Sequence, residues 1–148
     1  MTLSQQLLAK KTRPAVVADL VAVVKDEVKA KKGFSGTAIK AGYGAATKIV
    51  PDLVERVVRR LLPEFAAALD PFWIDFAAAG GGDFGAALDA RGPEVATALL
   101  GVTDAKVEGS GREPIKKAYR ALRGKADTHV QAALPRLGKA LQKHATIA

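Results

Sequence analysis

Apolar residues recur at intervals of three and four along most of this chain, and no segment shows the alternation of a β-strand. That period gathers apolar side chains on one face of an α-helix. The clearest case runs from Leu53 to Phe65, where Arg56, Arg59 and Arg60 lie opposite the apolar face. Alanine, leucine and lysine, which also favour helix, fill much of the remainder. We therefore predict an all-α protein, a compact helical bundle of about eight helices.

An aromatic cluster lies near the middle of the chain, just before Gly80-Gly81-Gly82. Aromatic side chains bury the most apolar area per residue, so such a cluster is typical of a core. Asp70 before Pro71 is typical of an N-cap and a first helical residue, and Pro63 predicts a kink or restart. We therefore expect a corner followed by a short helix over residues 70–79, named here the hub helix. The cluster comprises Phe65, Phe72, Trp73 and Phe76.

The pattern of residues 2–66 returns in residues 83–142. Pro14 and Pro93 correspond at an offset of 79, and Tyr43 and Tyr119, the two tyrosines of the chain, correspond at an offset of 76. Similarity at a nearly fixed offset indicates an internal repeat. We predict one helical domain over residues 1–148, in which units of about 2–66 and 83–142 are joined by the hub helix. Chance similarity between two amphipathic stretches rich in alanine, valine and leucine is the alternative.

Charge is distributed unevenly along the chain. Residues 1–62 carry a net charge of +7, residues 63–105 carry −6, and residues 106–148 carry +7. Basic segments of this kind attract either the acidic middle of the chain or anionic partners. A recognisable nucleic-acid motif is missing and few aromatic residues are interleaved, so a solvated helix face is the simpler interpretation. The candidate anion-binding residues are Lys116, Lys117, Arg120 and Arg123.

Glycines at positions 36, 42 and 44 surround Tyr43. They do not predict a phosphate-binding loop, because no strand precedes them and the full motif spacing is missing. Small residues on a helix face favour the close approach of another helix. That helix can belong to this chain or to a second copy in a homodimer.

Reactive side chains form no familiar catalytic pattern. The chain has no cysteine, and His129 and His144 lack acidic neighbours at ligand spacing. Asp70 and Asp83 suit helix caps better than metal binding or acid–base chemistry. We therefore expect a non-enzymatic protein with no catalytic residues, no metal and no cofactor.

The longest apolar run, from Pro14 to Val24, contains Asp19. It is shorter than the ~20 residues that span a bilayer. Residues 1–14 lack the apolar core of a signal peptide. We expect a cytoplasmic protein.

Two segments carry a family resemblance. They are Ser35-Gly36-x-x-Ile39-Lys40-x-Gly42-Tyr43 and Leu69-Asp70-Pro71-Phe72-Trp73. The chain resembles a family of small all-helical bacterial proteins of unassigned function, over nearly its whole length. The resemblance implies no catalytic residues, because the family supplies none.

Features that favour packing outnumber reactive ones, so we expect a binding or scaffolding protein. A groove for a small hydrophobic ligand or a partner helix is expected where the two units meet. The alternative is electrostatic binding of nucleic acid or an anionic membrane surface through the basic helices of residues 112–143. The candidate groove residues are Phe65, Phe72, Trp73, Phe76, Tyr43 and Tyr119.

Overall fold

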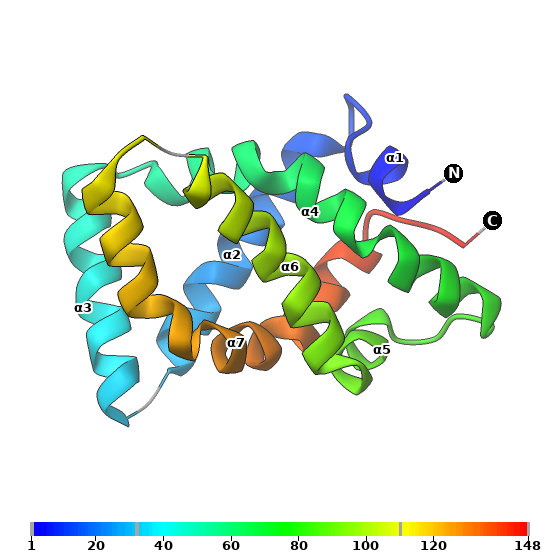
Figure 1. Ribbon diagram of the computed structural model, residues 1–148. Helices are drawn as coiled ribbons and strands as arrows, with labels where there is room; N and C mark the ends of the chain where they lie inside the picture. Colours follow the sequence, from blue (N-terminus) through cyan, green and yellow to red (C-terminus); the bar gives the residue numbers. More distant parts are fainter. Residues whose placement is uncertain (1, 32, 110, 148) are drawn as a thin grey trace.

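Helices make up all the regular secondary structure of the computed structural model, which describes residues 2–31, 33–109 and 111–147. The all-α bundle predicted from the sequence is confirmed. Seven helices are delimited in the described ranges, close to the expected number (Figure 1). They are α1 (Leu3–Leu7), α2 (Arg13–Ala30), α3 (Gly33–Ile49), α4 (Leu53–Ala78), α5 (Phe84–Ala90), α6 (Gly92–Glu108) and α7 (Glu113–Gln142).

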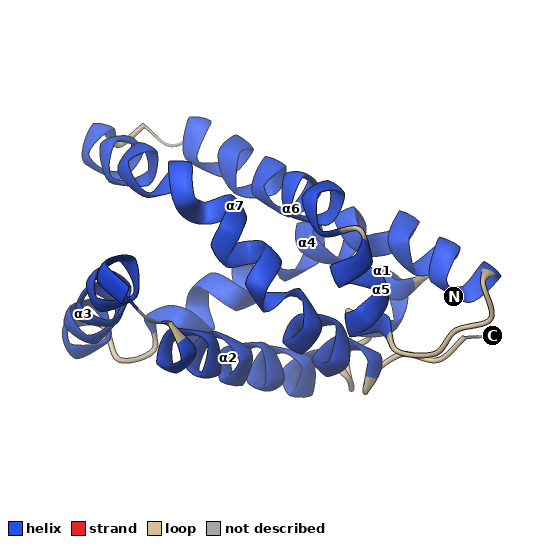
Figure 2. Cartoon of the chain, turned by 90° about the horizontal axis from the view of Figure 1, so that it is seen from below, coloured by secondary structure: helices blue, strands red, loops and turns tan. Residues whose placement is uncertain are grey.

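The long helices α2, α4, α6 and α7 surround the core. Helix α7 packs against α2, α5 and α6, while α4 contacts α1, α2 and α6 most extensively. Figure 2 shows α7 crossing the molecule between α6 and α2. Helix α3 lies at one end, where it makes comparatively few contacts, to α2 and α4. In the part of the chain that the structure describes, no helix has both the length and the apolar composition to cross a bilayer.

Helix α4 is continuous through Pro63 and Pro71. The expected corner and the separate hub helix over residues 70–79 are therefore wrong, since these residues form the last turns of α4 and the segment just after it. An interior proline costs a helix about 3 kcal/mol. Burying one large apolar side chain stabilises by about 1.5–3 kcal/mol, and one stripe of α4 buries five side chains across both prolines. The stripe consists of Leu62, Ala66, Leu69, Trp73 and Phe76.

Asp70 does not cap a helix of its own and instead bonds to the first turn of α1, whose N-cap is Thr2. Its Oδ1 accepts a hydrogen bond from the Ser4 backbone N–H at 2.8 Å, and its Oδ2 accepts one from Ser4 Oγ at 2.7 Å. A carboxylate is stabilised at that position by the exposed N–H groups and the helix dipole. Asp83, by contrast, caps α5 as predicted, because its side chain accepts a hydrogen bond from the Ala86 N–H.

The predicted aromatic core is confirmed around three rings. Trp73 and Phe84 meet edge to face at 4.9 Å between ring centroids, and Phe76 lies 5.3 Å from Trp73 and 5.1 Å from Phe84. Phe84 is completely buried. Phe65 and Phe72 are partly buried and pack against the hydrophobic core. The aromatic contacts therefore join the C-terminal part of α4 to α5.

The glycine run ends α4 as expected. Gly80 has a φ of +98°, its N–H bonds to the Ala77 carbonyl, and the Gly81 N–H bonds to the Phe76 carbonyl. These are the bonds of a Schellman motif, which favours glycine in the left-handed region.

The order of the helices agrees with the proposed repeat in part. A short helix followed by a long one occurs twice, as α1 and α2 and as α5 and α6. The first unit then breaks between α3 and α4, whereas α7 continues without interruption through the equivalent positions. The duplication stays a prediction.

Two glycines outside the predicted set bring helices together. A Cβ atom on Gly138 would lie 2.4 Å from the Gly85 Cα, and one on Gly85 would lie 2.3 Å from the Pro135 carbonyl oxygen. The backbones of α5 and α7 are therefore in direct contact. No atom lies within 4 Å of a Cβ built on Gly42 or Gly44, so the expectation of close helix approach at these two positions is wrong within this chain.

We expect Gly138→Ala to destabilise the protein by about 3 kcal/mol, the upper range for an overpacked core, because its methyl group would overlap the α5 backbone. Gly124→Ala is the matched control on the same helix, where a Cβ atom meets nothing within 4 Å. The control should gain about 0.5–1 kcal/mol from helix propensity. Urea unfolding of both variants measures the difference, and equal effects would contradict the close contact.

Candidate functional site

An apolar cavity lies between the four long helices, which turn apolar stripes toward one another. Its volume is about 310 Å³, and among the described residues that line it Thr103 alone is polar. This volume is at the lower end of the range of about 300–1,000 Å³ that is typical of small-molecule sites. The lining residues are Leu7 from α1; Leu20, Val23 and Val24 from α2; Val57, Val58, Leu61, Leu62, Phe65, Ala66 and Leu69 from α4; Leu99, Leu100 and Thr103 from α6; and Val130, Ala133, Leu137 and Leu141 from α7.

The cavity is open to solvent on one side. Leu62 and Leu141 at its floor are buried, whereas Val58, Leu61 and Phe65 are only partly so, and Val57 is 46% exposed. The apolar stripe of α4 is therefore wider than its neighbouring helices cover. An uncovered apolar surface inside a concave site is suited to a hydrophobic ligand.

A polar network connects α6 to α7 beside the cavity. The Tyr119 hydroxyl donates to Asp104 Oδ1 at 2.5 Å and lies 2.8 Å from Thr103 Oγ1. Arg123 donates to both Asp104 oxygens, from Nε at 2.9 Å and from Nη2 at 3.1 Å. The Thr103 hydroxyl also donates to the Leu100 carbonyl. These bonds hold α6 and α7 together at the polar edge of the cavity.

The same network shifts two pKa values. Hydrogen bonds from Arg123 and Tyr119 hold the pKa of Asp104 below its ordinary value of 3.8. Burial, and then the hydrogen bond to Asp104, raise the pKa of Tyr119. Asp104 is thus ionised and Tyr119 neutral at neutral pH, which suits a structural network.

The six candidate groove residues do not line a single cavity. Phe65 lines the cavity, while Trp73 and Phe76 belong to the aromatic core. Phe72 lies beneath the Arg91 guanidinium, 4.6 Å from ring centroid to Cζ, at a smaller hollow of about 240 Å³. Tyr43 is half-buried on α3 and Tyr119 is bonded to α6.

The four candidate anion-binding residues differ in exposure. Lys117 and Arg120 are exposed on α7 and Lys116 is half-exposed. Arg123 is engaged with Asp104, so its charge is already balanced. The electrostatic alternative therefore depends on the first three residues and stays a prediction.

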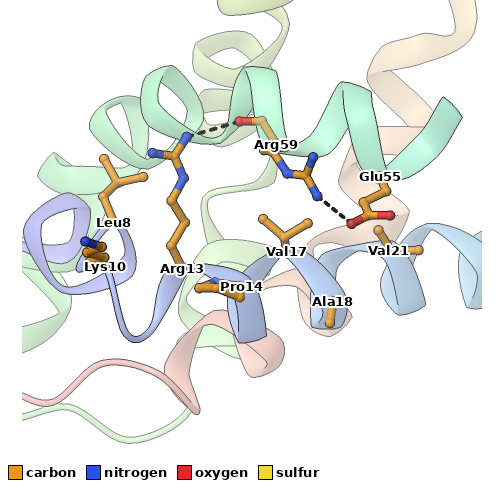
Figure 3. Close-up of a pocket in the computed structure, with 9 residues that line it drawn as sticks. All are labelled: Leu8, Lys10, Arg13, Pro14, Val17, Ala18, Val21, Glu55 and Arg59. Carbon is orange, nitrogen blue, oxygen red and sulfur yellow. Dashed lines mark hydrogen bonds and ion pairs between the residues drawn. The ribbon is translucent and has the colours of Figure 1, made fainter. Parts of the chain in front are cut away.

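A third hollow, of about 620 Å³, lies between the N-terminal part of α2 and α4 (Figure 3). Arg13 donates to the Arg59 carbonyl at 3.3 Å, and Arg59 pairs with Glu55 at 2.5 Å. Its walls contain both apolar and charged side chains. Two of the cations, Arg13 and Arg59, already have partners within the protein. It therefore defines a ligand less clearly than the central cavity.

The histidines lie apart in the structure. His144 Nε2 is 2.5 Å from Asp19 Oδ2, a pairing that sequence reasoning missed because 125 residues separate the two. Burial, followed by repulsion from Lys31 and Lys125, lowers the pKa of His129. Within the described ranges, no three His, Cys, Asp or Glu residues gather in a possible metal site.

Sequence reasoning also missed the aliphatic lining of the cavity. The signal was present in α4, where seven apolar residues between Leu53 and Phe65 form a stripe wider than one neighbouring helix covers. Which part of that stripe stays uncovered depends on packing between distant segments, and the local pattern does not reveal it.

A protein-family model with the description "Family of unknown function (DUF6918)" matches residues 3–145 of this chain. No curated protein and no solved structure matches it.

We expect Asp104→Ala to lower stability at neutral pH, because Tyr119 and Arg123 lose their shared acceptor. The pKa of Asp104 is depressed in the folded state, so its contribution is fully present above the ordinary pKa of 3.8 and is lost as pH falls through the lower folded value. The difference in urea midpoint between wild type and variant should therefore shrink on acidification below pH 3.8. Asp89→Ala, at an exposed position of α5, is the control. A difference that stays constant across this pH range would contradict the network.

Proposed function

The chain belongs to this family of unknown function, and we propose that it is a non-enzymatic binding protein for a small hydrophobic ligand. The ligand would occupy the cavity between α2, α4, α6 and α7 without covalent attachment. The observation that carries the proposal is the nearly uniform apolar lining, supplied by α1 and the four long helices, in which Thr103 is the one polar residue among the described side chains.

The open side of the cavity leaves apolar side chains in contact with water. Keeping apolar surface in water costs about 25 cal/mol per Å² of accessible area relative to burying it. An apolar occupant would restore dispersion contacts and displace poorly bonded water, which supports ligand binding as the use of this space.

The dimensions favour a small molecule over a partner helix. Two turns of helix with side chains are about 10 Å long and at least 10 Å wide, and they fill more than twice the volume of this cavity. A partner helix would therefore rest on the rim without filling the interior. A small ligand can contact all four helices at once.

The lining supports binding rather than catalysis. Acid–base or nucleophilic chemistry needs a titratable or activated group within hydrogen-bond reach of the substrate. Among the described lining residues, the hydroxyl of Thr103 is the one side-chain polar group, and it donates to the Leu100 carbonyl. The side chains around the cavity are thus suited to holding an apolar body.

We expect the wild-type protein to enhance the fluorescence of N-phenyl-1-naphthylamine, a neutral apolar dye, as the dye enters the cavity. Ala133→Phe, which fills space at the lining, should weaken dye binding by about tenfold or more. The matched control is Ala132→Phe, at the adjacent exposed position on α7, and its dye affinity should stay at the wild-type value.

Circular dichroism of both variants establishes that the helices persist. A wild-type protein that leaves the dye fluorescence unchanged would overturn the proposal. The same conclusion would follow if the two phenylalanine variants bound the dye equally well.

A further inference from the structure

The hydroxyl protons at the polar edge of the cavity are already used within the protein. Thr103 has one hydroxyl proton, and the acceptors within its reach are the Leu100 carbonyl at 3.0 Å and the Tyr119 oxygen at 2.8 Å. The Tyr119 hydroxyl donates its own proton to Asp104. A hydroxyl group is a single donor with two lone pairs. Thr103 and Tyr119 therefore offer a ligand lone pairs but no proton.

The remaining side chains of the lining add no donor. Apart from Thr103, the described residues that line the cavity have hydrocarbon side chains, without an N–H or O–H group. Arg123, the cation of the polar network, is not one of these lining residues, and it donates from Nε and Nη2 to the two oxygens of Asp104. A ligand in the cavity thus meets no free donor from the described side chains.

The backbone of the described lining residues does not supply a donor either. The first four N–H groups of a helix lack a partner within the helix, and later ones bond to the preceding turn. Leu7 and Val57 lie closest to the start of a helix, and each is the fifth residue of its helix, α1 and α4. The other described lining residues lie further along their helices. Their N–H groups are therefore placed to bond within the helices.

A wall without donors discriminates between ligands by their chemistry. Ketone, ester and carboxylate oxygens are acceptors, and they lose their hydrogen bonds to water on entering such a space. A hydrocarbon has no hydrogen bond to lose. A ligand N–H or O–H group can still donate to a lone pair of Thr103. The cavity is therefore least suited to a group that only accepts hydrogen bonds.

We infer that the ligand is an aliphatic or aromatic hydrocarbon throughout the part that the cavity holds, with no carbonyl, ester or carboxylate group there. The inference rests on the proposed function and specifies the chemical class of the ligand. An acceptor elsewhere on the ligand has to stay in solvent at the open side, where Val57 is 46% exposed.

The test is competition against N-phenyl-1-naphthylamine, whose amine is itself a donor, with 1,4-diisopropenylbenzene and 1,4-diacetylbenzene as competitors below their solubility limits. The two competitors have the same shape and differ in two CH₂ groups that are oxygens in the diketone. The carbonyls lie at opposite ends of the ring, so at most one can reach the open side. The wild-type protein should bind the hydrocarbon at least about tenfold more tightly than the diketone.

A donor added to the lining should reduce that preference. Leu137, a lining residue of α7, packs against the core, and Leu137→Gln introduces an amide with two N–H donors. The preference for the hydrocarbon should fall by about three- to tenfold, the effect of one hydrogen bond. Leu137→Met is the matched control, similar in size but without a donor, and should keep the wild-type preference. Circular dichroism establishes that both variants fold.

Two results would overturn the inference while the cavity proposal stands. One is a wild-type preference for the hydrocarbon of less than about tenfold, because a donor would then reach the carbonyls. The other is an equal preference in folded Leu137→Gln and Leu137→Met proteins. If the dye failed to bind the wild-type protein, the proposed function itself would fail.

Discussion

The fold depends on a single apolar stripe that runs the length of α4. Helices α1, α2, α5 and α6 all contact α4, and α7 closes the opposite side of the core through α2, α5 and α6. Two interior prolines would normally divide a segment of this length. The burial of Leu62, Leu69 and Trp73 along one face outweighs that cost and keeps the helix whole. If α4 were bent at either proline, the aromatic core and the α4 wall of the cavity would no longer lie along one straight helix.

Local signals predicted the parts of the fold that depend on local contacts. The helical period, the Asp83 cap and the glycine stop after α4 each involve residues within one or two turns of each other. Contacts between residues far apart in the sequence could not be predicted from these local patterns. Asp70 bonds to the first turn of a helix through Ser4, 66 residues away, and the contact between Gly85 and Gly138 follows from how α5 crosses α7. The same rule applies to the site, because Phe65 was identified from a local aromatic cluster, whereas the lining of the cavity is assembled from five separate helices.

The cavity has two kinds of wall. On one side, the bonds among Asp104, Tyr119 and Arg123 fix α6 against α7 with directional contacts. On the other, α2 and α4 supply aliphatic side chains whose packing has no preferred direction. The polar edge therefore fixes the position of one wall, whereas packing alone sets the shape of the aliphatic walls.

The direct backbone contact between α5 and α7 also has a mechanical consequence. Because Gly85 and Gly138 leave no side chain between them, the two helices cannot slide or roll without a steric clash, and that end of the bundle is stiff. The opposite end holds α3, with its comparatively few contacts, and the junction of α6 and α7 (Figure 1). Because low contact density favours local opening, we expect the α3 end to open at a lower free-energy cost than the end where α5 meets α7.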